Sequence, residues 1–283
     1  MPGWSVWRLA WGAVLSLTIA GLARRWRALS RDGFWGALLT GTLTLGFGGW
    51  AWGVALVAFF LTSTALTRWH RESKAALARF GAKGGERDLG QVLANGGVAA
   101  LLAVLSALLS QRLVAVAFAG SLAAATADTW ATEVGVLSRT PPRRIVDGRV
   151  VPPGTSGGVT PMGWLAGAAG ALFLPAFFFL LARGEAALAG LPALPVRDAL
   201  PAALGGVVGM TVDSLLGATL QGCYRCPACG EMTERRVHCG RPALRQRGWA
   251  WLDNDGVNLA ATITGALVAT ACAWGDCPVD GGK

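Results

Sequence analysis

The chain has 283 residues, of which 53% are hydrophobic and 14% are charged, and its net charge is +9. A soluble domain carries about 25% charged residues, so this composition excludes an ordinary soluble protein and indicates an integral membrane protein. The positive charge suits anionic lipid headgroups or bound phosphate. Because no nucleic-acid-binding module accompanies it, nucleic acid is not an expected partner.

Eight apolar runs follow one another along the chain, and each is a candidate membrane helix. Two of them are separated only by the glycine-rich residues 46–49, where we expect a break, because consecutive glycines favour a tight turn. The run before this break is about 15 residues long, short for a full crossing, which leaves room for a re-entrant or tilted segment. The predicted fold is an all-α transmembrane bundle of about eight helices, at 4–23, 33–47, 50–67, 89–109, 113–138, 161–182, 198–221 and 254–274.

Basic residues lie mainly in alternate loops. The loops 24–32, 68–88, 139–159 and 222–249 hold 4, 6, 4 and 6 Lys or Arg residues, which is 20 of the chain's 25. Basic loops stay in the cytoplasm, so we predict a multi-pass protein of the cell (inner) membrane with both termini outside. The first run has its charges after it and no A-x-A site, which indicates a spanning helix and not a cleavable signal. The chain is thus one membrane domain, 1–283, with a small cytoplasmic insert at 222–248.

Two of the runs carry an aspartate on a stripe of small residues. In 113–138 and in 198–221, small residues recur every fourth position in line with Asp128 and Asp213. This spacing keeps them on one helix face, where small residues allow close helix packing. Packing explains the glycines but not the carboxylates, which usually face a functional cavity when they lie in a membrane. Each aspartate lies roughly 14–17 Å from the following loop, so we expect a cavity open toward the basic loops.

Carboxylates that converge in one cavity repel each other unless a cation joins them. Mg²⁺ takes oxygen ligands, commonly one or two carboxylates with phosphate oxygens and water, and Asp128 can ligate it directly. Glu133 lies about 140° round the helix from Asp128, so it would act through water, on a second ion or on a loop arginine. The polar segment 253–258, at the start of the last helix, can face the same mouth. Capping by Asp253 or Asn254 is the alternative there.

Two further segments have the chemistry to bind phosphate. The glycine-rich residues 154–158 precede a helix N-terminus and can form a nest of backbone N–H groups; the alternative is a connector whose helix is capped by Thr160. The basic segment 63–87 can neutralise charge in phosphoryl transfer, or it can be a solvated positive-inside loop. Within it, Lys74 and Arg87 are the first candidates. No G-x-x-x-x-G-K-[ST] string occurs in the chain.

A cysteine-rich pattern in 222–248 predicts a zinc site. Cys226-Pro-Ala-Cys229-Gly resembles a zinc knuckle, and His238 and Cys239 follow it. The expected ligands are Cys226, Cys229, Cys239 and either His238 or Cys223, because adjacent residues share one metal only with strain. Four protein ligands leave no open position, so the Zn²⁺ would be structural.

Motifs spread over residues 60 to 262 resemble a family of integral membrane proteins that includes plant phytyl-phosphate kinase and the animal transmembrane-protein-19 group. Their order and spacing together are specific, while each alone is weak. The cysteine-rich insert is not general to that family, which argues against a catalytic role for it. The motifs are 60–63 with Thr67, 91–96, 128–135, 154–160, 213–219, and 252–255 with Val257 and Asn258.

The resemblance implies a kinase that transfers a phosphoryl group from a nucleoside triphosphate, CTP or similar, to an isoprenoid monophosphate lipid. It implies Mg²⁺ on Asp128 and Asp213, with Asp253 or Asp255 completing the site, and Lys74 and Arg87 beside the transferred group. A cation- or proton-coupled transporter and a CDP-lipid-forming cytidylyltransferase are the alternatives, and whether the chain forms a homo-oligomer is left open. The expected substrate- or nucleotide-binding residues are Ser63, Thr67, Asn95, Thr132, Glu133, Gly154, Thr155, Ser156, Gly157, Gly158, Ser214, Asn254 and Asn258.

Overall fold

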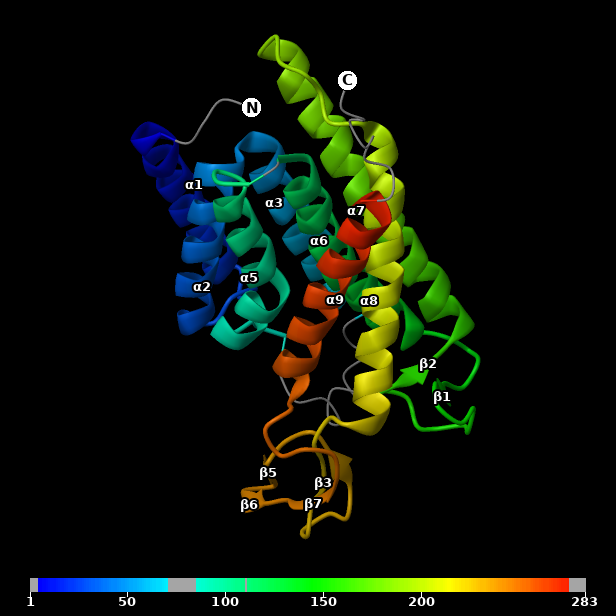
Figure 1. The fold of residues 1–283 in the computed structure, drawn as a ribbon. Helices are drawn as coiled ribbons and strands as arrows, with labels where there is room; N and C mark the ends of the chain where they lie inside the picture. The colour runs from blue at the N-terminus through cyan, green and yellow to red at the C-terminus, as the bar shows by residue number, and fades with distance from the viewer. Residues whose placement is uncertain (1–4, 71–84, 110, 275–283) are drawn as a thin grey trace.

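The computed structural model describes residues 5–70, 85–109 and 111–274, and it confirms an all-α bundle (Figure 1). Six of the helices in these residues are long and apolar enough to cross a membrane, while α2 and α5 are shorter. Each helix overlaps one of the eight predicted runs. The helices are α1 (Val6–Arg25), α2 (Arg31–Leu43), α3 (Trp50–Arg68), α5 (Leu89–Leu105), α6 (Gln111–Gly135), α7 (Pro161–Leu188), α8 (Ala199–Thr219) and α9 (Asn254–Trp274).

The expected break between the second and third runs is present. After α2 the chain makes a π-helical turn, η1 (Thr44–Gly48), and Gly49 then adopts a φ of 100°, a conformation that glycine tolerates because it has no Cβ. α3 begins at the next residue. The carboxylate of Glu185 in α7 accepts a hydrogen bond of 3.1 Å from the backbone N–H of Ala51 and so satisfies one free donor at this helix start.

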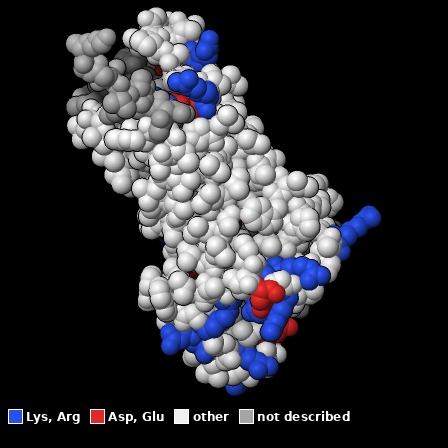
Figure 2. Space-filling view, turned by 45° about the vertical axis from the view of Figure 1, so that its right-hand side comes forward, with Lys and Arg blue, Asp and Glu red and all other residues white. Residues whose placement is uncertain are grey.

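Successive helices run up and down, so the described parts of the four basic loops share one end of the bundle, while α1 begins and α9 ends at the other (Figure 1). The middle of the face in Figure 2 carries no charged side chains, and most of its Lys and Arg gather at the loop-rich end. Many large apolar side chains are exposed along the helices, among them Leu61, Leu101 and Leu165. An uncharged, apolar belt of this kind fits the hydrocarbon core of a bilayer. Which side of the membrane the loops occupy stays a prediction.

The loop-rich end also carries all the strands of the described residues, and each is short. β1 (Arg143–Arg144) pairs with β2 (Gly158–Val159) in the loop between α6 and α7. Between α8 and α9, β3 (Cys223–Arg225) lies between β4 (Met232–Thr233) and β7 (Leu244–Arg247), while β5 (Val237–His238) and β6 (Arg241–Pro242) form a hairpin. A short 3₁₀ helix, η3 (Val196–Asp198), precedes α8 at the opposite end.

α6 is the central helix of the bundle, because most of its side chains are buried. At the end away from the basic loops, Trp52, Phe118 and Phe178 of three helices pack together, with ring centroids 4.3–5.6 Å apart. Such aromatic contacts add to the burial of apolar area. This cluster anchors α3, α6 and α7 to one another and fixes the direction of the α6 axis.

The small-residue stripes of α6 and α8 pack against each other and against α9. A Cβ placed on Gly209 of α8 would lie 2.6 Å from the Cβ of Ala124 in α6 and 2.7 Å from the carbonyl oxygen of Ala261 in α9. Gly120 and Gly265 meet in the same way at the α6–α9 contact. Close approach of three backbones through small residues is typical of membrane helices. This contact between the small-residue stripes of α6 and α8, called the seam below, brings the helix faces that carry the two aspartates against each other.

Candidate functional site

Asp128 and Asp213 follow the seam by one turn and meet where it opens toward the basic loops. Their carboxyl groups lie within hydrogen-bonding reach of each other, although α6 and α8 are separated by more than 60 residues of chain. Both side chains are partly buried. Oδ2 of Asp213 is buried and receives no well-formed hydrogen bond from the described residues. Two carboxyl groups in contact, with an acceptor oxygen left over, form an arrangement that a cation or a shared proton stabilises.

Glu133 adds a third carboxylate to the aspartate pair, on the side toward α3 and the start of α5. Its carboxylate accepts a hydrogen bond of 2.7 Å from Thr67 Oγ1 and interacts electrostatically with both Asp128 and Arg87. The sequence alternatives for Glu133 included pairing with a loop arginine, and in the structure Glu133 interacts electrostatically with Arg87. Glu133 thereby connects the aspartate pair to the cation at the α5 end of the site.

Arg87 is a well-anchored cation. Its backbone pairs with the α1–α2 loop through hydrogen bonds of 3.0 Å with Ala28 and Ser30, and its guanidinium lies 5.5 and 5.4 Å from the ring centres of Phe59 and Phe60. Burial lowers the pKa of Arg87 to about 10, with the charge of Glu133 opposing the change. The guanidinium therefore remains protonated at neutral pH. Cation–π contact with the two rings holds it in one orientation.

Glu234, in the cysteine-rich insert, is a fourth acidic residue near the pair, and the sequence did not single it out. It accepts a hydrogen bond from the Ser156 hydroxyl of the glycine-rich loop and interacts electrostatically with Asp213. Its only sequence signal is that it is one of two acidic residues in an otherwise basic segment, 222–249. The insert therefore reaches the acidic cluster through the loop that precedes α7.

The glycine-rich loop 154–158 is docked against the last two turns of α8. Gly157 has a φ of 74°, and a Cβ there would collide with Ala218 and with the carbonyl oxygen of Ser214, one residue beyond Asp213. The backbone N–H groups of Thr155 and Gly158 already bond within the loop, to Pro152 and Thr155. Those of Ser156 and Gly157 donate to no described acceptor, so this pair is the part of the loop that suits an anion.

Both hydroxyls of this loop have acceptors. Thr155 Oγ1 donates to the Pro152 carbonyl at 2.7 Å, and Ser156 donates to Glu234. Thr160 caps α7 by accepting a 3.0 Å hydrogen bond from the Gly163 N–H, which is the capping role that the sequence left open. The backbone N–H groups of Ser156 and Gly157, and not the hydroxyl groups of the loop, are thus the donors without a described acceptor.

The start of α9 divides its polar residues between capping and the bundle interior. Asp253 Oδ1 accepts a 3.1 Å hydrogen bond from the Gly256 N–H and so caps the helix. Asn258 is buried, and its Nδ2 donates to the Asn254 carbonyl at 2.8 Å. Asp255 is partly buried. Asp253 thus caps the helix, and a metal-binding role for Asp253 or Asp255 stays a prediction.

The remaining sequence candidates are scattered around the site. Ser63 is buried on α3 one turn before Thr67, and Asn95 of α5 donates to the Gln91 carbonyl at 3.0 Å. Thr132 is exposed, and Ser214 adjoins the docked loop. Lys74 lies outside the described residues.

The chemistry of the acidic cluster, Asp128, Asp213, Glu133 and Glu234, would suit a hard divalent cation. Its donors are all carboxylate oxygens, it contains a buried oxygen with no well-formed hydrogen bond, and Glu133 and Glu234 add negative charge around the pair. Carboxylates are the protein ligands that Mg²⁺ prefers. Without a cation or a proton, this much like charge in a partly buried position would be strongly unfavourable.

The cysteine-rich insert forms a compact metal-ligand cluster. Ligand atoms of Cys226, Cys229, His238 and Cys239 all lie within 4.8 Å of one another, whereas Cys223 is not in this group and instead interacts with Arg247 and Glu234. Cys239 and Gly240 have φ angles of 51° and 70°, as at the centre of a two-residue hairpin turn between β5 and β6. This turn lets the adjacent His238 and Cys239 point to one place, the combination that we expected to be strained.

The thiols of this cluster have divergent acidities. Although burial opposes it, hydrogen bonding from the backbone N–H of Cys229 and from His238 lowers the pKa of Cys226 to about 6. Hydrogen bonding with Cys229, followed by burial, raises the pKa of Cys239 to about 11. A bound metal would remove this difference between the two pKa values, because it deprotonates each coordinating thiol. Three thiols and one imidazole within reach of one point fit Zn²⁺.

Zinc analysis of the purified protein should give about one zinc per chain. Cys226→Ser combined with Cys229→Ser should remove it, because two of the four ligands are lost. Cys272→Ser is the matched control: this exposed thiol lies near the far end of α9 and should leave the zinc content unchanged. Full zinc in the double variant would show that these ligands are wrongly assigned.

The fold and the site define a polytopic helical membrane protein with a cluster of acidic side chains at one end of the bundle. A family model for integral membrane protein DUF92 matches residues 14–266. The chain therefore belongs to the DUF92 family of integral membrane proteins, the family that its motifs predicted. No solved structure gives a significant match.

Curated relatives match along nearly the whole chain. Protein PGR of Arabidopsis thaliana is 32% identical over 273 residues, 90% of this chain and 93% of PGR. The uncharacterized membrane protein MJ0933 of Methanocaldococcus jannaschii is 31% identical over 263 residues, 92% of each chain. Protein VTE6, chloroplastic, of Arabidopsis thaliana is 26% identical over 269 residues, 93% of this chain and 71% of VTE6.

Proposed function

We propose that this protein is a membrane kinase that transfers a phosphoryl group from a nucleoside triphosphate to an isoprenoid monophosphate, giving the diphosphate. The observation that carries the proposal is the meeting of Asp128 and Asp213, from separate helices, beside Glu133 and Arg87. Acidic groups for a cation and a fixed guanidinium for phosphate are the components that phosphoryl transfer uses. The resemblance to the family of phytyl-phosphate kinase supports the choice of an isoprenoid acceptor.

The position of the cluster favours a kinase over a coupled transporter. Transporter sites usually lie near the middle of the bilayer, at the interface between repeats. Here the aspartates lie at the end of the α6–α8 seam, next to the docked loop 154–158 and the insert. A water-soluble nucleotide can reach this end, and a lipid phosphate can present its head group there from between the helices.

In the proposed reaction, an oxygen of the isoprenoid monophosphate attacks the γ-phosphorus of the nucleotide. The bond from this phosphorus to the bridging oxygen breaks, and a nucleoside diphosphate leaves. Mg²⁺ held by Asp128 and Asp213, with Asp253 or Asp255 completing the site, would neutralise charge on the phosphates. Arg87 would orient the acceptor phosphate, and the N–H groups of Ser156 and Gly157 would contact the nucleotide phosphates. The acceptor is already ionised, so no general base is required.

A product assay separates the candidate activities. The purified protein, given Mg²⁺, CTP or ATP and geranylgeranyl or phytyl monophosphate, should form the isoprenoid diphosphate and a nucleoside diphosphate in equal amounts. Release of pyrophosphate would instead identify a cytidylyltransferase. Absence of both products, with solute movement across vesicles that contain the protein, would identify a transporter.

A further inference from the structure

A deep apolar pocket lies beside the acidic cluster, among the N-terminal helices. It is enclosed by α1, α2, η1, α3 and α5, and it contains about 710 Å³ of empty space, part of which is open to the surroundings. Its lining on α3 runs from Gly53 to Phe60, seven residue steps, or about 10 Å along the helix axis at 1.5 Å per residue. The pocket thus extends along α3 for about two helical turns.

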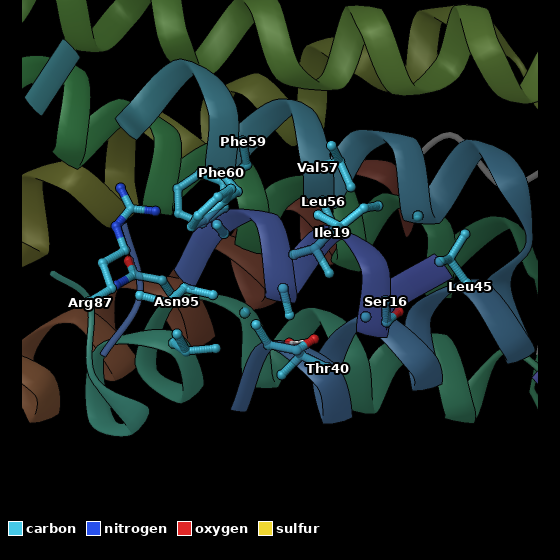
Figure 3. A pocket seen from close by; sticks show the side chains of 18 of the residues that line it. Ser16, Ile19, Thr40, Leu45, Leu56, Val57, Phe59, Phe60, Arg87 and Asn95 are labelled. Carbon is cyan, nitrogen blue, oxygen red and sulfur yellow. Dashed lines mark hydrogen bonds between the residues drawn. The ribbon is translucent and has the colours of Figure 1, made fainter. Parts of the chain in front are cut away.

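The charged and amide side chains of the pocket are concentrated at one end. In Figure 3, Arg87 and Asn95 lie together near Phe59 and Phe60, while Leu45 lies at the opposite end. Apolar side chains such as Leu56 and Val57 line the part between.

Two hydroxyl groups also line this pocket. Thr40 Oγ1 donates to the Gly36 carbonyl of its own helix at 2.9 Å, so it does not require a partner in the pocket. Ser16 Oγ is also buried without a hydrogen-bond partner among the described residues, but it lies far from Arg87 (Figure 3). The pocket therefore offers one cationic end and a predominantly apolar body.

The cationic end adjoins the proposed phosphoryl-transfer site. Arg87 lines the pocket and also interacts electrostatically with Glu133, which in turn interacts with Asp128. Asn95 contributes a buried Oδ1 that has no hydrogen-bond partner among the described residues. An unsatisfied buried polar atom beside a fixed guanidinium indicates that a polar ligand group belongs at this end.

We infer that this pocket holds the hydrocarbon chain of the lipid substrate, with the lipid phosphate at Arg87. One cation at one end of about 710 Å³ of largely apolar space matches a lipid with one phosphate and one chain, so the structure favours a prenyl monophosphate over a two-chain phospholipid. The choice of a prenyl chain rests on the proposed kinase function. The lining on α3 spans about 10 Å, so a longer chain would extend out through the open part of the pocket.

A matched pair of substitutions on α3 tests this placement. Val57 lines the pocket, whereas Val54 lies one turn earlier on the same helix, does not line it and is 37% exposed. Val57→Trp should weaken binding of geranylgeranyl monophosphate to the detergent-solubilised protein by roughly tenfold or more, because the indole displaces several chain carbons. Val54→Trp should change it by less than about twofold, because its side chain faces away from the pocket. Equal affinities for the two variants would overturn the inference.

Photo-crosslinking keeps the test informative should Val57→Trp fail to fold. A geranylgeranyl monophosphate that carries a diazirine on its chain should label α1, α3 and α5 of the native protein at pocket residues such as Ile19 and Val57. Unlabelled geranylgeranyl monophosphate should compete for this labelling, and phosphatidic acid should not. Labelling confined to outward-facing residues, or competition by phosphatidic acid alone, would contradict the placement.

The two proposals can fail separately. Formation of nucleoside diphosphate without labelling of the pocket would overturn the lipid placement and leave the kinase intact. Labelling of the pocket without formation of either nucleotide product would retain the lipid site and overturn the kinase.

Discussion

Asp128→Asn and Asp213→Asn are each expected to lower the rate of phosphoryl transfer by roughly a thousandfold, because loss of a carboxylate ligand removes several kcal/mol of cation-mediated stabilisation of the transition state. The measurement is formation of nucleoside diphosphate at saturating substrates. Asp147→Asn is the matched control, since this acidic residue lies in the loop between α6 and α7 and pairs with Arg144 and Arg149. Its activity should remain within about twofold of the native value.

The stability of these variants should distinguish loss of a ligand from loss of the fold. Two carboxyl groups in contact destabilise each other when both are charged, so neutralising one should leave the melting temperature in EDTA unchanged or higher. Saturating Mg²⁺ should raise the melting temperature of the native protein, because at a hundred times its dissociation constant it adds about 2.7 kcal/mol to the free energy of unfolding. Mg²⁺ should not raise the melting temperature of Asp128→Asn. A variant that melts well below the native protein in EDTA would indicate that Asp128 has a structural role.

Gly157→Ala should lower the transfer rate by roughly a hundredfold, because it displaces the loop 154–158 from α8. Gly157 has a φ of 74°, and a Cβ there would collide with Ala218 and with the Ser214 carbonyl, both in the turn after Asp213. The measurement is the Michaelis constant for the nucleotide together with the turnover number, since a misplaced phosphate-binding loop should affect both.

Gly148→Ala provides the matched control for Gly157→Ala. Gly148 lies in the same loop region with a φ of 67°, but a Cβ there would meet no atom within 4 Å. It therefore carries the same left-handed strain, about 1–2 kcal/mol, without the collision. Similar activities for the two variants would mean that contact between the loop and α8 is unimportant for function.

The membrane helices and the meeting of the aspartates could be predicted from sequence because both depend on local repeats. Apolar runs indicate where the helices lie. A spacing of four places small residues and an aspartate on one helix face, and such a face packs closely against another face of small residues. The break at 46–49 was predictable because consecutive glycines favour a turn, and Gly49 indeed adopts a φ of 100°.

The parts of the site that depend on tertiary contacts were not predictable. Glu234 is far from Ser156 and Asp213 in sequence, and only the folding of the insert brings it to them. The inclusion of His238 in the cysteine cluster, in place of Cys223, depends on the left-handed backbone of Cys239 in a tight hairpin turn. The pocket among α1, α2, α3 and α5 includes residues of the 91–96 motif, but the sequence did not predict it, because most of its lining consists of ordinary apolar side chains.

A bound divalent ion can be located directly by anomalous X-ray scattering from Mn²⁺, which replaces Mg²⁺ in oxygen-ligand sites. Crystals of the native protein soaked in Mn²⁺ should show an anomalous peak between the carboxylates of Asp128 and Asp213, and crystals of Asp128→Asn should lack it. A native protein whose two aspartates remain hydrogen-bonded to each other, with the ion elsewhere or absent, would contradict a shared cation site.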